Sequence, residues 1–246
     1  MRFEVLGALR VRRDDGEITI ARGRSSSALS WLAVNAGRSV TAESLITVLW
    51  EQPPVTAAAK VKAIVRELGA AVGPGVIDRS PSGFRIDADV HDIDALRFEQ
   101  LAGSGRECLA GGDLGRAREA LEAALRLWRG DPCPDLAQAL PALATIAGLV
   151  NLRLSVQEEL NALDLLGNVA YPLVAELRAQ VTAHPERPRL QRQLALALYR
   201  VDRQVEALET LRGACDELGD DDGRIGALEA AILRHSPDLA GGEWTS

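Results

Sequence analysis

The sequence is poor in the residues that build catalytic and metal-binding sites. Three cysteines are scattered along the 246 residues, without a CxxC pair or a histidine at ligand spacing: Cys108, Cys133 and Cys215. Three histidines are equally isolated: His91, His184 and His235. This spacing indicates small apolar or surface thiols, and it disfavours a metal site or a catalytic Ser-His-Asp or Cys-His arrangement. Neither GxxxxGKS/T nor GxGxxG occurs, which excludes the common nucleotide-binding loops. We therefore expect no cofactor, no metal and no enzymatic activity.

Long apolar runs are also missing. No stretch approaches the 18 or so apolar residues that a membrane-spanning helix needs, and the N-terminal segment MRFEVLGALRV lacks the layout of a signal peptide. We expect a cytoplasmic protein without a membrane partner. Its 47% hydrophobic and 26% charged residues are typical of a soluble globular protein, and its length suits two domains better than one.

The net charge of −7 is unevenly distributed. Residues 1–90 contain 12 Lys/Arg and 10 Asp/Glu, a net charge of +2, whereas residues 91–246 contain 16 and 25, a net charge of −9. Phosphate binding depends on local rather than total charge, so the first part of the chain permits binding to nucleic acid.

One stretch, residues 56–73, has a clear helical pattern. Apolar residues recur at spacings of four, three and four: Val61, Val65, Leu68 and Val72. Three cations lie off that apolar stripe: Lys60, Lys62 and Arg66. The spacing predicts a helix with one buried face, and Gly73-Pro74-Gly75 predicts its end. The segment Val76-Ile77, a turn at residues 79–83 and the alternating Phe84-Arg85-Ile86 then predict a β-hairpin.

The residues before this helix predict a small sheet and two further helices. Apolar residues alternate over residues 1–22 around an Asp14-Asp15-Gly16 turn, with Ile18 and Ile20 beginning a return strand. Helices are expected over residues 26–36 and over residues 42–50, the latter with Thr41 as N-cap and Glu43 in its first turn. A sheet, three helices and a hairpin within about 88 residues are typical of a winged helix.

From Asp94 onward the pattern is almost entirely helical. Two helices broken at residues 111–113 have small and apolar residues at tetratricopeptide positions: Leu101, Gly105, Cys108, Ala117, Leu121 and Ala124. The same positions recur later: Leu194, Ala195, Leu198, Ala207, Leu211 and Ala214. A weaker copy lies between them, with Ala170, Val174 and Leu177 on its second helix. We predict a mostly α fold with a small β component, in which three imperfect helical pairs form a short solenoid.

Several segments in order resemble the Streptomyces antibiotic regulatory protein family. The OmpR/PhoB-type winged helix of that family resembles MRFEVLGALRV, AVNAGRSVTAESLITVLW, the Pro-Pro-x-Thr-Ala start of the third helix, and SGFRID. Its bacterial transcriptional activator domain resembles residues 127–136 and 183–200. The resemblance implies a winged-helix DNA-binding domain at 1–90 and a tetratricopeptide-like activator domain at 93–240. It also implies a pathway-specific activator that binds direct repeats in promoter DNA as a dimer and contacts RNA polymerase.

The predicted DNA-binding residues lie on the third helix and in the wing: Thr56, Lys60, Lys62, Arg66, Arg79 and Arg85. The sequence departs from the family at several positions. Glu67, Gly69 and Ala70 stand where arginines are expected. Ala59 replaces a polar or basic residue, Ile64 a common histidine, and Ser80 a basic wing residue. Because phosphate contacts supply much of DNA affinity, binding is expected to be weak and less salt-sensitive than is usual.

These departures leave an alternative function open. A degenerate winged helix that has lost DNA binding could act as a protein-interaction module or anti-activator, with the third helix as an apolar docking face. A ligand-sensing regulator is a third possibility, which would need a pocket between domains or repeats. The dispersed Trp31, Trp50 and Trp128 do not indicate such a pocket and are expected in the core.

Overall fold

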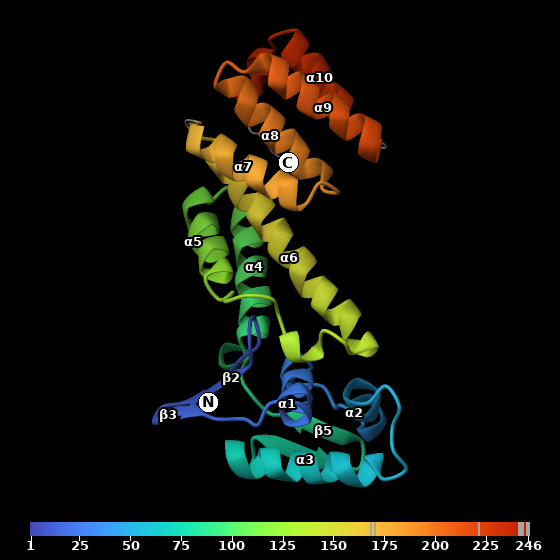
Figure 1. Ribbon diagram of the computed structural model, residues 1–246. Helices are drawn as coiled ribbons and strands as arrows, with labels where there is room; N and C mark the ends of the chain where they lie inside the picture. Colours follow the sequence, from blue (N-terminus) through green and yellow to red (C-terminus); the bar gives the residue numbers. More distant parts are fainter. Residues whose placement is uncertain (168, 170, 221, 241–243, 245–246) are drawn as a thin grey trace. The chain divides into compact units, whose positions relative to one another are not determined.

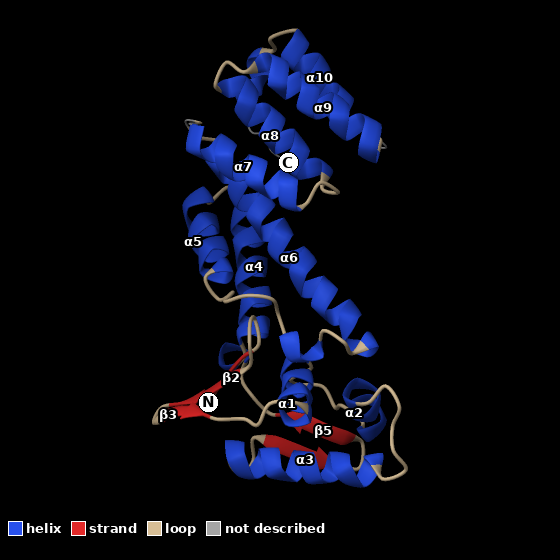
Figure 2. Ribbon diagram, in the orientation of Figure 1, coloured by secondary structure: helices blue, strands red, loops and turns tan. Residues whose placement is uncertain are grey.

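The computed structural model of the chain describes residues 1–246 except 168, 170, 221, 241–243 and 245–246. It is mostly helical, with two small antiparallel sheets in the N-terminal part (Figures 1 and 2), and this confirms the predicted fold class. The chain forms two compact units, residues 1–154 and residues 155–246.

The first unit begins with a three-stranded antiparallel sheet in the order β1-β2-β3. Its strands are short: β1 (Arg2–Glu4), β2 (Arg10–Arg13) and β3 (Gly16–Ile18). Phe3 pairs with Val11, which pairs in turn with Ile18, so one row of apolar residues crosses the sheet. The predicted sheet is confirmed, although the return strand ends at Ile18 and does not include Ile20.

Three helices follow, close to the positions predicted from the apolar spacing: α1 (Arg24–Val34), α2 (Ala42–Leu49) and α3 (Ala57–Val72). Thr41 caps α2, because its hydroxyl oxygen accepts a hydrogen bond from the backbone N–H of Ser44 at 3.1 Å. Gly73 ends α3 with a φ of 107°, a conformation that favours glycine.

The predicted wing is the hairpin of β4 (Ile77–Ser80) and β5 (Gly83–Ile86). Val40, between α1 and α2, pairs with Phe84 through two backbone hydrogen bonds of 2.8 Å. A Cβ atom on Gly83 would lie 2.3 Å from the carbonyl oxygen of Val40, so only glycine fits this crossing. The wing is therefore fixed to the helical part of the winged helix.

The helix that follows the wing, α4 (Asp94–Ala110), is joined to the first sheet by hydrogen bonds. The carboxylate of Asp94 is buried and accepts hydrogen bonds from the backbone N–H groups of Val5 at 2.7 Å and Leu6 at 3.0 Å. Burial raises the pKa of Asp94, and these two bonds lower it by a smaller amount. From the loop after the next helix, Arg129 donates its backbone N–H to Leu6 and its guanidinium to the carbonyl of Ala8.

These contacts place the winged helix and the first helical pair in one compact unit. Phe3 and Ile93 also form a parallel bridge, so the backbone of the sheet meets the start of α4 directly. The division into domains at 1–90 and 93–240 stays a prediction from sequence, and the compact units divide elsewhere, at residues 154 and 155 within α6.

The first predicted helical pair is confirmed as α4 and α5 (Leu114–Leu125), broken at residues 111–113. A Cβ atom on Gly105 would lie 2.6 Å from a methyl carbon of Leu121, so the absence of a side chain lets the two helices approach. A short helical turn, η2 (Pro134–Leu136), leads to the long helix α6 (Leu140–Leu165).

By length and composition alone, α6 could cross a membrane. Its most apolar window has a mean hydropathy of 1.2 and is 17% buried. The prediction from uninterrupted apolar runs did not single out this helix. Its second half, however, carries Glu158 and Asn161, which are 4% and 2% exposed and bind polar side chains of the second unit. These contacts pack the second half of α6 within the second unit.

The second unit contains the end of α6 and four more α-helices: α7 (Tyr171–Ala183), α8 (Pro188–Arg200), α9 (Gln204–Leu218) and α10 (Arg224–Leu233). A short turn, η3 (Pro237–Ala240), follows. The six residues predicted at tetratricopeptide positions on α8 and α9 all belong to its buried core. Val174 and Leu177 of the weaker copy are also buried there, and Ala170 lies outside the described residues.

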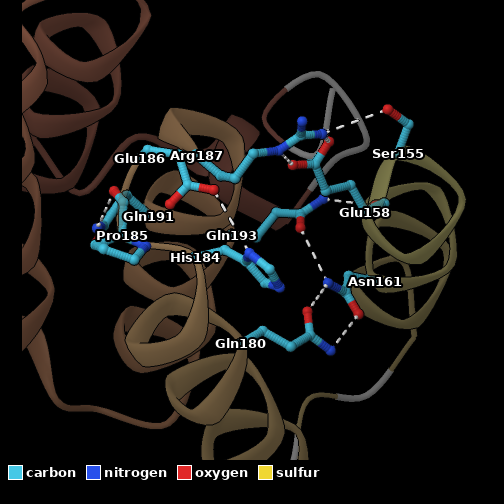
Figure 3. A network of polar contacts seen from close by, with 10 residues as sticks. All are labelled: Ser155, Glu158, Asn161, Gln180, His184, Pro185, Glu186, Arg187, Gln191 and Gln193. Atoms are coloured by element: carbon cyan, nitrogen blue, oxygen red, sulfur yellow. Dashed lines mark hydrogen bonds and ion pairs between the residues drawn. The ribbon is translucent and has the colours of Figure 1, made fainter. Parts of the chain in front are cut away.

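A buried polar network joins α6 to α7 and α8 (Figure 3). Arg187 binds the carboxylate of Glu158 through two hydrogen bonds of 2.8 and 2.9 Å. Gln193 donates to the backbone carbonyl of Glu158 at 2.7 Å, and Asn161 donates to Gln180 at 2.6 Å. Because buried polar groups require partners, this network fixes one register between the helices.

Candidate nucleic-acid interface

The outer face of α3 carries the three cations that the sequence singles out. The inner face of the helix is buried: Ala57, Val61, Val65, Leu68 and Val72. Lys60, Lys62 and Arg66 are exposed, and none of them forms an ion pair with another described residue. Their charges are therefore available to a ligand outside the chain.

The N-terminal end of α3 adds to this positive face. Thr56 is the N-cap residue and is exposed, and its side chain makes no capping hydrogen bond. The first turn contains no acidic residue. Unsatisfied N–H groups and the helix dipole favour an anion at such an end, so a phosphate could lie near Thr56 and Lys60.

The predicted wing cations have partners within the chain. Arg79 reaches back from β4, and its guanidinium donates to the backbone carbonyl of Val65 on α3 at 3.3 Å. A Cβ atom on Gly69 would lie 3.0 Å from the same guanidinium, so the glycine leaves room for it. Arg85 lies 3.6 Å from Asp78 on the paired strand, and both side chains are about half exposed. The two arginines stay predicted DNA contacts, but each would have to exchange an internal partner for phosphate.

The tip of the wing is a cluster of hydroxyl groups. Ser80 and Ser82 share a hydrogen bond of 2.7 Å, and the hydroxyl of Ser39 donates to Ser82 at 3.3 Å. Hydroxyl groups bind phosphate through hydrogen bonds without adding charge.

The sequence interpretation missed one basic residue at α3. Arg13, on β2, donates to the last carbonyl of the helix, that of Val72, at 2.7 Å, and it also lies 3.2 Å from where a Cβ atom of Gly73 would stand. A cation at a helix C-terminus is stabilising because it meets the negative end of the helix dipole. The pattern Arg-Val-Arg-Arg on β2 indicates only which side chains point away from the core. It does not indicate the partner of Arg13, because that partner is 59 residues away in the sequence.

Comparison with known proteins places the chain in a family. A family model described as "Bacterial transcriptional activator domain" matches residues 93–233. The regulatory protein DnrI of Streptomyces peucetius is 30% identical over 257 residues, which cover 97% of this chain and 94% of DnrI. The chain belongs to the Streptomyces antibiotic regulatory protein family. This confirms the resemblance found in the sequence. The family is one of transcriptional regulators and not of enzymes.

Other members of the family are longer. The regulatory protein AfsR of Streptomyces coelicolor is 34% identical over 247 residues, which cover 98% of this chain but 25% of AfsR, so the chain spans about a quarter of that relative. A solved structure, "Mycobacterium tuberculosis EmbR in complex with low affinity phosphopeptide", is 31% identical with a TM-score of 0.87. It aligns with 97% of this chain and 66% of that chain. A relative thus shares the fold of a winged helix followed by a helical part.

Several positions distinguish this family member at α3. Glu67 and Ala70 are exposed on the helix, where family resemblance leads us to expect arginines. Ala59 is exposed and Ile64 is half-buried. The apolar atoms that α3 exposes are therefore mainly alanine methyl groups. In the loop before α3, Val55 is fully exposed. Glu67 would repel a phosphate, so the outward surface of α3 is most basic at Lys60, Lys62 and Arg66.

Proposed function

We propose that this regulator binds double-stranded promoter DNA through the outer face of α3. The observation that carries this proposal is the exposure of Lys60, Lys62 and Arg66, without internal partners, on the third helix of a winged helix. Lysine and arginine side chains neutralise phosphates, and polar side chains on a groove-facing helix read base edges. Thr56 would contact the backbone at the start of α3, and Arg79 and Arg85 would reach phosphate from the wing.

The activator function is proposed from family membership. By analogy with that family, two copies would bind direct repeats side by side, and the helical part, residues 93–240, would contact RNA polymerase. A DNA-binding activator of this kind works in the cytoplasm. The polymerase contact would come from polar faces of the solenoid, because the leucine and alanine stripes of α8 and α9 are already buried in its core.

The test is binding of the full chain to genomic DNA fragments, followed by fluorescence anisotropy on a selected fragment across a salt series. The observed affinity is expected to fall with salt, with a log–log slope of about −0.9 for each phosphate contact. Lys62→Ala combined with Arg66→Ala should weaken binding and make the slope shallower by roughly two contacts.

A matched control removes two exposed arginines outside the winged helix, Arg97 on α4 and Arg234 just after α10. Substituting both by alanine changes the net charge of the chain equally. If this control weakened binding as much as the α3 variant, the effect would reflect total charge, and the assignment of α3 as the interface would be abandoned.

The alternative function, a protein-interaction module or anti-activator without DNA binding, is favoured by two observations. Arg79 and Arg85 have internal partners, and Glu67, Gly69 and Ala70 leave α3 with fewer cations than the family pattern. This alternative predicts no binding to any genomic fragment even at low salt, together with a stable complex with another protein in the absence of DNA.

A further inference from the structure

A cleft of about 690 Å³ lies within the first unit, between the end of α2 with the turn that follows it and the segment from η2 to the start of α6. One wall belongs to the winged helix and the other to the segment after the first helical pair. The hydroxyl of Ser27 on α1 donates to the backbone carbonyl of Asp135 at 3.0 Å, which holds the two walls together. The cleft is thus built by segments about 90 residues apart in the sequence.

The cleft has a mixed lining, and its apolar part comes from α2, the turn after it and the start of α6. Val48, Trp50 and Ala139 line it and are 8%, 9% and 9% exposed, so each keeps only a small apolar surface open to the cleft. Leu140, also in the lining, is 79% exposed. Pockets of 300–1,000 Å³ with mainly apolar linings and a few polar groups are the usual sites for small molecules. Burial of apolar atoms here would therefore stabilise a small ligand.

The charged groups in the lining are all acidic. Glu51 and Asp135 contribute carboxylates, and neither forms an ion pair with another described residue. The last turn of α2 contains no basic residue, so the helix itself supplies no cation to its negative end. On the opposite side, α6 starts with Leu140 and Pro141, and the proline has no N–H to offer an anion.

One cation lies next to a residue of the cleft lining. The guanidinium of Arg24 lies over the Trp50 ring, 5.1 Å from its centre, and Arg24 is not part of the lining. The indole therefore offers the cleft its remaining apolar surface rather than a free face for a cation. Glu51 and Asp135 are therefore the groups that would select a ligand by its charge.

We propose that this cleft binds a small organic cation with an apolar body, of the chemical class of aromatic amines. The ammonium group would lie between Glu51 and Asp135, and the ring would cover Trp50 and Leu140. The site is separate from the outer face of α3, and the proposal does not depend on DNA binding. It supplies the pocket between predicted domains that a ligand-sensing regulator requires.

The experiment titrates the full chain with three matched fluorinated probes and follows their ¹⁹F line widths. The probes are 2-[4-(trifluoromethyl)phenyl]ethylamine, the corresponding ethanol and 4-(trifluoromethyl)phenylacetate. The amine should bind roughly tenfold more tightly than the alcohol at low salt, because exposed ion pairs contribute up to about fivefold each. The acid should bind most weakly.

Variants locate the site. Glu51→Gln combined with Asp135→Asn should lower the affinity for the amine to that for the alcohol, while leaving the alcohol unchanged. Leu140→Ser, at an exposed position, should weaken amine and alcohol alike. The matched control is Asp14→Asn with Asp15→Asn, which removes two exposed carboxylates from the turn between β2 and β3.

Three results would overturn the proposal. The first is no amine binding at millimolar concentration. The second is equal affinity for amine and alcohol, which would make the cleft an apolar groove without charge selection. The third is an equal loss in the control variant, which would mean that the amine responds to the overall negative charge of the chain.

Discussion

The ion pair between Arg187 and Glu158 allows a sharp test of how the second unit is held together. Removing the guanidinium by Arg187→Ala leaves the Glu158 carboxylate, whose side chain is 5% exposed, without its two charged hydrogen bonds. Breaking a buried pair in this way typically costs 3–5 kcal/mol. The side chain of Arg187 is 21% exposed, so water can replace part of the interaction. We therefore expect a loss of about 3 kcal/mol in the free energy of unfolding of the second unit.

Removing both charges should cost less than removing one. In the double variant Glu158→Met with Arg187→Met, no charge is buried and the volume is roughly kept, so the expected loss is below about 1.5 kcal/mol.

Urea unfolding followed by circular dichroism, with hydrogen exchange of the α7 and α8 amides, measures these differences. Hydrogen exchange is needed because the chain has two compact units, whose transitions need not coincide. A double variant that is as unstable as Arg187→Ala would refute the reasoning, since the loss would then come from packing rather than from a stranded carboxylate.

Four further predictions concern the first unit. Gly105→Ala should lower the free energy of unfolding of this unit by about 1–3 kcal/mol, because the new methyl group would clash with Leu121. Adding Leu121→Ala should relieve that clash but leave a smaller core. Urea unfolding midpoints test both variants. Asp94→Ala should cost about 2 kcal/mol or more, since two buried N–H groups lose their acceptor, whereas Asp92→Ala, a less buried neighbour, should cost little. Burial raises the pKa of Cys133 to about 12, so alkylation at pH 8 should be far slower at Cys133 than at the exposed Cys215. The thiol of Cys133 therefore keeps its proton in the native chain at pH values above about 8.5, where the unfolded chain loses it. The free energy of unfolding of the wild type should then fall relative to that of Cys133→Ala as pH rises from about 8.5 to 12. An equal dependence of the free energy of unfolding on pH in the two proteins would contradict this.

The parts of the fold that depend on local signals could be predicted from the sequence. The four valine and leucine residues of α3 and the glycine after it define both its buried face and its end, and Thr41 marks the start of α2. The return strand was predicted too long. Its partner β2 begins at Arg10, and the pairing of Val11 with Ile18 places Ile20 opposite Leu9, which lies before that strand.

The features that depend on distant contacts could not be predicted. In the sequence, Asp94 looks like the first residue of a helix after an acidic connector. Nothing near it indicates that its carboxylate accepts hydrogen bonds from backbone N–H groups 88 and 89 residues away. Arg79 was interpreted as a DNA contact because of its place in the wing. Its bond to Val65 depends on the space beside Gly69, which only the packed structure reveals. Residue type alone predicts that a cation is present. Tertiary packing decides which cations have no internal partner and so remain available to bind DNA.

The contacts of Asp94 and Arg129 with the first sheet also determine where this protein can be cut or recombined. A fragment ending at residue 90 would lose the acceptors for Val5 and Leu6 and the backbone partner of Phe3. The loop after α5 also contacts this N-terminal segment, because the backbone N–H of Cys133 donates to the carbonyl of Val5 at 2.9 Å. A chimaera that exchanges winged helices between relatives should therefore join after residue 136, carrying α4, α5 and η2 with the winged helix they complete.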